Sequence, residues 1–403
     1  LRLAFLPDRG GPVQVHLLPL DGGEARQLGS FDEAPSDLRW TPGSEALLVT
    51  QAVTVDPDWR GARGKDPRPR GPKAAQVAWK LPYKSDGVGY LLAREIHLFR
   101  LDARTGEKRQ LTDGPFDVLG CHVCADGSQV AYIRTREGRF AHATDLWVCD
   151  IEGRQHRRLA QDHAMVMQPV WSPDGRWIVF TGSRGEGDAQ MCLWLAEPST
   201  GQVTQLGDDD VQAGGPDAVY WREDSRALFF SRAWRGRHQI ARISVPDGKL
   251  HVLAQGHRQL GALGYDGTHL YYSIDTAVAP CGLHVCAPPG TGERRVSDLN
   301  PWWKDRPPLK LEPREFRVPD GKGGVETIHG WLLRAEGAQQ PMPLLKDVHG
   351  GPGAYVQHDY DTNVFWQVLC CEGWAILALD AVGSASYGRE FCERLQGHWG
   401  EYD

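Results

Sequence analysis

The sequence predicts a β-propeller followed by the opening strands and helix of an α/β domain. Three observations lead to this prediction: a hairpin signature that recurs through residues 1–305, a second signature that closes each repeat, and strand–helix–strand order within residues 306–403. A repeat of four short strands cannot bury both of its faces alone, so neighbouring repeats must stack on it. We expect seven blades, of which six are visible in the sequence.

The first signature is a tight turn followed by a short apolar strand. Residues 171–175 precede the apolar run 177–180, and residues 263–267 precede the run 270–272. Asp-Gly sequences favour such turns because glycine accepts the positive φ that a hairpin requires. Further copies precede apolar runs that begin at Ala46, Val130 and Ala227.

The second signature is a glycine turn and a strand that closes on Leu or Val. The closing residues are Leu28, Leu111, Leu159, Leu206, Leu253 and Val296, at intervals of 83, 48, 47, 47 and 43. A period in the forties is typical of a propeller blade. The first blade lacks its opening strand, and the chain begins inside an apparent strand. We therefore expect the natural N-terminus, with part of a seventh blade, to lie upstream of Leu1.

The long first interval indicates an insert between about residues 51 and 95. It contains a basic, proline-rich stretch at 60–73. A solvated loop is the simplest interpretation of this composition. The alternative is a lid, a substrate-edge element or a subunit contact. RNA binding is disfavoured because no aromatic platform is interleaved with the arginines.

The pattern changes after about residue 305, where we place the boundary between a propeller at 1–305 and an incomplete second domain at 306–403. Prolines 307, 308 and 313 predict a linker. Strands are expected at 315–318 and 328–333, on either side of a Pro-Asp-Gly turn.

A strand–helix–strand unit follows. The apolar run 344–348 predicts a strand, residues 363–369 have helical periodicity, and 374–379 form the kind of continuous apolar run that is buried on both faces of a parallel sheet. This order is a βαβ crossover and opens an α/β domain.

Composition excludes several classes of partner. The chain has 403 residues, a net charge of −7 and 41% hydrophobic residues, which is typical of a globular protein. The charge balance does not favour nucleic acid or an anionic membrane, and no apolar run reaches the roughly 18 residues that span a bilayer. We expect neither partner, and no metal or organic cofactor.

The nine cysteines argue against a disulfide framework, because their number is odd and Cys370 and Cys371 are adjacent. This favours a cytoplasmic location, although a signal peptide upstream of Leu1 stays open. Cys121 and Cys124 form a C-x-x-C sequence without a second pair, and buried hydrophobic packing explains them better than a metal site.

The candidate site is the turn His349-Gly350-Gly351-Pro352, which follows the strand 344–348. Such a turn can direct backbone N–H groups and one polar side chain toward the charge that develops on an attacked carbonyl. An ordinary tight turn is the alternative interpretation.

The nucleophile that should accompany this turn is not found in the chain. The sequence from Gly383 to Gly388 does not fit G-x-S-x-G because position 385 is alanine, and Ser384 and Ser386 are not expected to act as nucleophiles.

Together the repeats, the linker, the 349–352 turn, the 383–388 loop and the closing Gly397-His398-Trp399-Gly400 resemble the prolyl oligopeptidase family of serine peptidases. The likeness is greatest to its acylaminoacyl-peptidase-like branch and increases toward the C-terminus. It implies an α/β-hydrolase domain with a Ser, Asp and His triad, and a propeller that gates the active site and admits short peptides.

The resemblance also assigns roles. His349 matches the position that supplies a side-chain donor to the oxyanion, and Gly350, Gly351 and Pro352 shape that turn. The family usually has an arginine where this chain has Val382, so a charge contact from that position is not expected.

The implied activity is serine-type cleavage of short peptides through an acyl-enzyme, with the triad beyond Asp403. This chain alone is then expected to be inactive. Its expected partners are a peptide substrate and a C-terminal hydrolase continuation or fragment; a homo-oligomer is also compatible.

The alternative is a non-catalytic propeller that binds peptides or a partner protein. An esterase would use the same chemistry. The choice between acylaminoacyl, dipeptidyl and endo-oligopeptidase specificity stays open.

Overall fold

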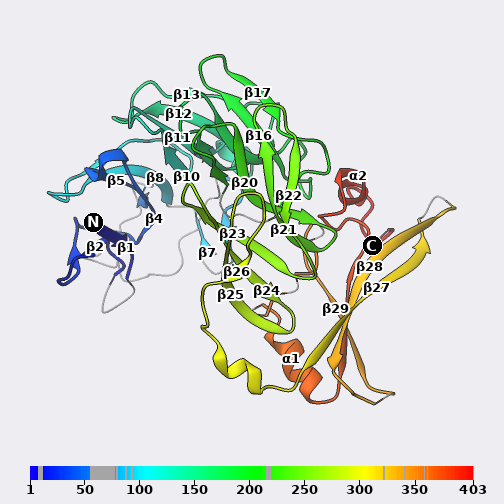
Figure 1. The fold of residues 1–403 in the computed structure, drawn as a ribbon. Coiled ribbons are helices and arrows are strands. Elements are labelled where there is room, and N and C mark those ends of the chain that lie inside the picture. The colour runs from blue at the N-terminus through cyan, green and yellow to red at the C-terminus, as the bar shows by residue number, and fades with distance from the viewer. Residues whose placement is uncertain are drawn as a thin grey trace, which may run out of the picture. The chain divides into compact units, whose positions relative to one another are not determined.

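The structure is a computed structural model that describes residues 1–7, 12–54, 78, 80–86, 89–91, 94–214, 219–320, 323–339, 341–351, 353–357, 359–360 and 362–402. Within it the chain divides into two compact units. Unit 1 comprises Leu1–Thr181 and Leu195–Thr204, and unit 2 comprises Gly182–Trp194 and Gln205–Asp403. Strands dominate the described parts of both units (Figure 1).

Three sheets of three or four strands lie wholly within unit 1. The first has three strands, β1 (Arg2–Phe5), β2 (His16–Pro19) and β3 (Arg26–Gln27). The second has the order β4 (Pro35–Trp40), β5 (Ala46–Thr54), β8 (Arg94–Asp102) and β9 (Lys108–Gln110). The third has the order β10 (Val118–Val123), β11 (Gln129–Thr135), β12 (Thr144–Asp150) and β13 (Arg157–Arg158).

The strands from residue 165 to 295 form two further sheets. A nine-stranded sheet contains β14 (Met165–Trp171), β15 (Ile178–Ser183), β16 (Cys192–Glu197), β17 (Gln202–Gln205), β18 (Gln212–Ala213), β19 (Tyr220–Trp221), β20 (Ala227–Trp234), β21 (Arg237–Ser244) and β22 (Leu250–Ala254). In it, the short β18 pairs with both β16 and β20 and so joins two repeats. A four-stranded sheet follows, with β23 (Gln259–Tyr265), β24 (Leu270–Thr276), β25 (Ala279–Cys286) and β26 (Arg294–Arg295).

The predicted closing residues occupy equivalent places in these sheets. The backbone N–H groups of Leu28, Leu111, Leu159, Leu206 and Val296 each donate to a carbonyl thirteen residues earlier, across 2.8 Å in every case. Leu253 lies instead within β22, where the pairing with β21 shifts register. The repeat read from the sequence is therefore confirmed, and the four-stranded sheets are consistent with propeller blades. The count of seven blades stays a prediction.

Neighbouring sheets share apolar cores. Leu48 and Leu98 of the second sheet pack in one cluster with Val130 and Tyr132 of the third, and all four side chains are at most 1% exposed. This burial explains why single blades need neighbours, because each sheet has apolar residues on both faces.

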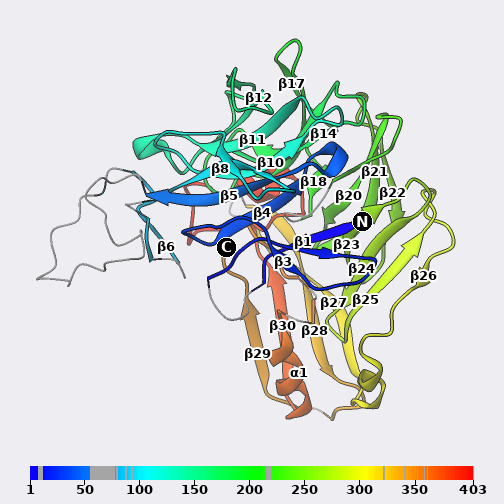
Figure 2. The ribbon, with the colours of Figure 1, turned by 90° about the vertical axis from the view of Figure 1, so that its left-hand side faces the viewer.

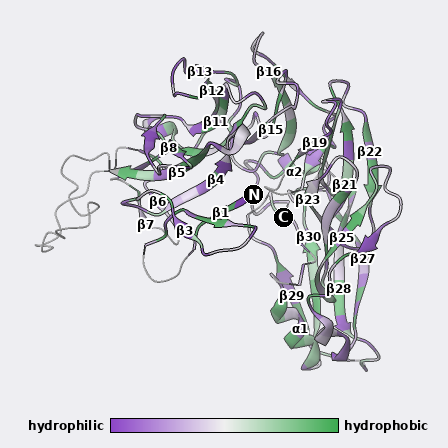
Figure 3. Ribbon diagram, turned by 60° about the vertical axis from the view of Figure 1, so that its left-hand side comes forward, coloured by the Kyte–Doolittle hydropathy of each residue, from purple (hydrophilic) through white to green (hydrophobic). Residues whose placement is uncertain are grey.

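The C-terminal sheet in unit 2 has the order β27 (Leu309–Pro319), β28 (Val325–Ala335), β30 (Ala375–Asp380) and β29 (Leu344–Val348). Only the β29–β30 pair is parallel. Helix α1 (Val364–Cys371) connects this pair and packs on β28 and β30 (Figure 2). Figure 3 shows α1 and much of β30 in the colours of apolar residues. The predicted βαβ unit is confirmed.

Two further short helices complete the described part of unit 2. A 3-10 helix spans Pro301–Asp305 before β27, and α2 spans Arg389–Glu393 after β30.

The predicted linker at 307–313 is wrong from Leu309 onward, because β27 already begins there. Pro313 pairs with Trp331 of β28. A proline has no N–H to donate, but β27 is an edge strand of this sheet, where a proline is tolerated. Within the Pro-Asp-Gly signal, Pro319 ends β27 and Asp320 follows it, while Gly321 lies outside the described residues; both β27 and β28 extend further than expected.

Most of the predicted insert at 51–95 lies outside the described residues; its described part includes the short antiparallel pair β6 (Lys84–Ser85) and β7 (Gly89–Tyr90). All nine cysteines are free. Among the described residues, no group of three or more His, Cys, Asp or Glu side chains is placed to hold a metal ion. None of the described helices has the length and apolar character needed to cross a membrane.

Candidate functional site at the ends of β29 and β30

The candidate site begins where the two parallel strands end side by side. Val348 of β29 pairs with Leu379 of β30, so the residues that follow, His349 and Asp380, reach the same edge of the sheet. In α/β sheets this carboxyl edge is where functional side chains gather. The Nε2 atom of His349 lies 3.8 Å from Oδ1 of Asp380, whose side chain is fully buried.

The loop after β30 returns to His349. The Oγ atom of Ser384 lies 2.9 Å from Nε2 of His349, and the Nδ1 atom of the same ring lies 3.4 Å from the Gly350 carbonyl oxygen. A carbonyl oxygen only accepts, so this contact requires the proton on Nδ1. In the neutral ring Nε2 then accepts from the Ser384 hydroxyl. Burial lowers the pKa of His349 and favours this neutral form, while the Gly350 contact opposes it.

Asp380 is held by two donors. The backbone N–H of Val356 donates to Oδ1 across 2.7 Å, and the Tyr387 hydroxyl donates to Oδ2 across 2.6 Å. Burial nevertheless raises the pKa of Asp380 to about 7, because the cost of desolvating the carboxylate exceeds what the two hydrogen bonds return. Near neutral pH this carboxyl therefore exists in both protonation states.

Ser386 fastens the same loop to the turn between β20 and β21. Its Oγ accepts from the Gly236 N–H across 2.8 Å, and its carbonyl accepts from the Arg235 N–H across 2.7 Å. Its own N–H donates to Gln212 Oε1 across 2.7 Å. These three bonds hold Ser386 at a φ of 76°, a left-handed conformation that a serine rarely adopts. Its hydroxyl therefore has a structural partner.

Ser384, His349 and Asp380 have the composition of a catalytic triad but a different geometry. In a triad the hydroxyl and the carboxylate contact opposite ring nitrogens. Here Oγ of Ser384 and Oδ1 of Asp380 both face Nε2 of His349, and Ser384 is only 1% exposed. This arrangement does not activate Ser384 as a nucleophile, and it agrees with the interpretation of the loop from its sequence.

The predicted oxyanion turn is described except for Pro352, which lies outside the described residues. Gly351 adopts a φ of 61°, and its carbonyl accepts from the Ala354 N–H across 2.6 Å. Within the described part of the chain, the N–H groups of Gly350 and Gly351 have no acceptor. These two donors are the groups that could stabilise an oxyanion.

Sequence reasoning located His349 and the glycines but missed the roles of Asp380, Ser384 and Tyr387. A signal for Asp380 was present, because an acidic residue ends an otherwise apolar central strand. The contacts of Ser384 and Tyr387 depend on how the 381–388 loop folds back, and the sequence carries no pattern for that.

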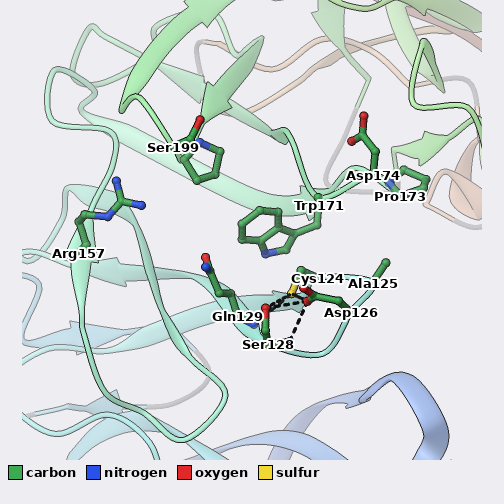
Figure 4. Close-up of a pocket in the computed structure, with 12 residues that line it drawn as sticks. Cys124, Ala125, Asp126, Ser128, Gln129, Arg157, Trp171, Pro173, Asp174 and Ser199 are labelled. Carbon is green, nitrogen blue, oxygen red and sulfur yellow. Dashed lines mark hydrogen bonds between the residues drawn. The ribbon is translucent and has the colours of Figure 1, made fainter.

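A separate cavity of about 270 Å³ lies in unit 1, between the turns at 124–129 and 171–175 (Figure 4). Asp126 accepts from the Cys124 thiol and from the Ser128 hydroxyl, each across 2.7 Å. Asp174 accepts from the Ser172 hydroxyl across 2.6 Å. Both aspartates thus stabilise the hairpin turns that the sequence predicted.

Comparisons with known proteins agree with this structure. The sequence profile of the dipeptidyl peptidase IV N-terminal region matches residues 124–235. An uncharacterized peptidase of Bacillus subtilis, YuxL, is 24% identical over the whole chain, which covers 63% of that relative. Dipeptidyl-peptidase 5 of Trichophyton schoenleinii is 23% identical over 58% of the chain and 32% of that relative.

Solved structures match the chain over nearly its whole length. The acylaminoacyl peptidase of Pyrococcus horikoshii gives a TM-score of 0.75 at 18% identity, and the match covers 100% of this chain and 59% of that one. A puromycin-hydrolyzing peptidase of Mycobacterium tuberculosis gives 0.67 at 14% identity, over 98% of this chain and 60% of that one. The chain thus spans less than two thirds of the length of each of these relatives. In sequence and fold, the chain is a homologue of prolyl oligopeptidase family peptidases that resembles the N-terminal part of acylaminoacyl peptidase.

Proposed function

We propose that this chain is the propeller and oxyanion-turn part of a serine peptidase that cleaves short peptides. The observation that carries the proposal is the glycine turn after β29, whose two N–H groups have no acceptor among the described residues, in a chain related to peptidases along its whole length. The names of the relatives favour acylaminoacyl-peptidase-like or dipeptidyl-peptidase-like specificity.

The chemistry is acyl transfer. A serine Oγ attacks the peptide carbonyl carbon and loses its proton to a histidine, which passes it to the leaving amine as the C–N bond breaks. Water then hydrolyses the ester and regenerates the serine. The proposed role of the 349–351 turn is to donate to the oxyanion from a backbone N–H and from His349. His349 can donate from Nε2 only when that nitrogen carries a proton. In the neutral ring with the proton on Nδ1, the backbone N–H is therefore the donor, and His349 joins it only when the ring is protonated or changes tautomer.

The triad itself is proposed to lie beyond Asp403, in a continuation of the α/β-hydrolase sheet or in a separate fragment. Strand β29 forms one edge of its sheet and exposes Leu344 by 53% and Val348 by 69%. Helix α1 exposes Val364, Phe365 and Val368. An open parallel edge and an apolar helix face favour such a covering segment.

The proposal also assigns the two domains and a location. Residues 1–305 would form a seven-bladed propeller that gates the site, and residues 306–403 would open the hydrolase domain. Nine free cysteines fit a reducing, cytoplasmic location.

The test is intact mass measurement after exposure to a fluorophosphonate, which forms a phosphonyl ester with an activated serine and releases fluoride. We expect an adduct on the protein that extends beyond Asp403, or on a fragment bound to this chain, and none on residues 1–403. Peptide mapping should place the adduct outside the 403 residues. An unlabelled protein that still binds peptides would overturn the proposal in favour of a binding propeller.

A further inference from the structure

We propose that Ser384 is a positioning residue that fixes the ring orientation and the tautomer of His349, and thereby holds the 349–351 turn in place. The structural part of this inference is independent of enzymatic activity. Its consequence for catalysis rests on the proposed function.

The two contacts of His349 carry the argument. Ser384 Oγ and the Gly350 carbonyl face opposite ring nitrogens, at 2.9 and 3.4 Å. A ring held at both nitrogens cannot turn over without exchanging a donor contact for an acceptor contact. The carbonyl accepts only, whereas a hydroxyl donates or accepts. The pair therefore favours the proton on Nδ1, with Nε2 accepting from Ser384.

Ser384 is itself held firmly. Its N–H donates to the Ala381 carbonyl across 3.0 Å, and its neighbour Ala385 donates to the Ala354 carbonyl across 2.9 Å. The second bond ties the loop to the segment that follows the glycine turn. Ser384 is 1% exposed, so water does not replace its hydroxyl. The loop thus offers a fixed hydroxyl to a ring that is 17% exposed.

Asp380 does not take over this role. Its Oδ1 lies 3.8 Å from Nε2, beyond hydrogen-bond distance, and already accepts from the Val356 N–H. Its Oδ2 accepts from Tyr387. In the described part of the chain, Ser384 is therefore the side chain that hydrogen-bonds to Nε2 of His349.

The consequence is that Ser384 controls whether His349 can be a donor. While Nε2 accepts from Ser384, the neutral ring offers no N–H from that nitrogen. His349 then influences the reaction through the position of the glycine turn. Loss of the hydroxyl would free Nε2, admit the other tautomer and let the turn move. Misplacement by about 1 Å costs catalysis up to about a hundredfold.

The first measurement uses the complete protein labelled with ¹⁵N-histidine. Two-bond ¹⁵N–¹H spectra distinguish the two tautomers, and His349→Gln assigns the His349 signals. We expect the Nδ1–H tautomer in the unaltered protein. Ser384→Ala should shift it toward a mixture, whereas the control Ser386→Ala should not, because that equally buried hydroxyl contacts Gly236. An Nε2–H tautomer in the unaltered protein, or unchanged signals in Ser384→Ala, overturns the inference. The spectrum of the unaltered protein decides even if a variant fails to fold.

The second measurement uses the complete protein and needs the fluorophosphonate adduct as its premise. We expect Ser384→Ala to lower kcat about ten- to a hundredfold with KM changed less than about twofold, and Ser386→Ala to leave kcat closer to its original value. An equal loss in both variants would indicate a general packing effect and contradict the positioning role. If no adduct forms, the proposed function fails while the tautomer experiment still decides the role of Ser384.

Discussion

The hydroxyl of Tyr387 donates to Oδ2 of Asp380 across 2.6 Å, inside a site where the carboxyl is fully buried. The two residues connect the end of β30 to the loop that also carries Ser384. Because burial holds the pKa of Asp380 near 7, protonation of this carboxyl should influence the stability of the whole cluster.

The contribution of Asp380 to the stability of the protein should fall as pH rises from its free pKa to its pKa in the folded state. Its pKa is about 7 in the folded state and 3.8 as a free side chain. The folded state therefore binds this proton more tightly, so the contribution of Asp380 to stability is highest below about pH 4, decreases between about pH 4 and 7, and levels off above. The full effect is about 4 kcal/mol.

Asp380→Asn should remove that part of the pH dependence. The amide can still accept from Val356 and cannot ionise, so we expect the variant to gain stability relative to the parent at pH 8 and not at pH 4. The measurement is the free energy of unfolding by urea at pH 4, 6 and 8. Parallel pH profiles for parent and variant would show that Asp380 is already ionised at pH 6.

Tyr387→Phe should raise the pKa of Asp380 further, because the hydrogen bond from Tyr387 favours the carboxylate. We expect a loss of about 1–3 kcal/mol at pH 8, where an ionised Oδ2 is left without its donor, and a smaller loss at pH 5. Urea unfolding of parent and variant at both pH values measures the two losses. Equal losses would mean that the ring packing of Tyr387 against His329 and Phe391 matters more than its hydroxyl.

How much the sequence predicts depends on the range of the interactions. The repeat positions of Leu111 and Leu206 could be predicted because each follows a local turn at the end of a repeat. In the structure the backbone N–H of each donates to the carbonyl thirteen residues earlier. The strands 344–348 and 374–379 could be paired because a helix between two apolar runs favours a parallel crossover. These features depend on periodicity and turn chemistry, which a single sequence contains.

The parts that could not be predicted depend on contacts across long stretches of chain. Ser386 is held by Gly236 and Gln212, which lie 150 and 174 residues earlier. Pro313 looked like a linker residue because its tolerance in β27 depends on that strand being at an edge. No local pattern reports either fact.

Lys80 in unit 1 offers a second test of a buried charge. Its ammonium group lies 2.6 Å from Oε2 of Glu95 and 3.1 Å from Oδ2 of Asp117, and it is only 4% exposed. Burial raises the pKa of Glu95 to about 7 despite this partner. Lys80→Met should cost about 3–5 kcal/mol at pH 8, because it leaves two carboxylates without a cation.

The loss in Lys80→Met should shrink at pH 5, where Glu95 can take up a proton. The double variant Lys80→Met/Glu95→Gln is the control and should recover part of the stability at pH 8. The free energy of unfolding of the four proteins in this cycle gives the coupling energy. A coupling near zero would show that Lys80 pairs mainly with Asp117.

Gly236, the glycine of the β20–β21 turn, should not tolerate a side chain. Its φ is 68°, and an added Cβ would lie 2.8 Å from both Oδ2 of Asp380 and Cζ2 of Trp331. Trp331 is 2% exposed and cannot move without disturbing the core of the C-terminal sheet. Gly236→Ala therefore combines backbone strain with overpacking, and we expect a loss of about 2–5 kcal/mol.

The matched control is Gly337→Ala. Gly337 has a similar φ of 74°, and an added Cβ would meet no heavy atom within 4 Å. This variant should lose only the strain, about 1–2 kcal/mol. Denaturant unfolding of both variants separates the two contributions, and near-ultraviolet circular dichroism reports whether the surroundings of Trp331 change. Equal losses would show that the β20–β21 turn is not held against Trp331 and Asp380. They would also contradict the view that this turn anchors Ser386.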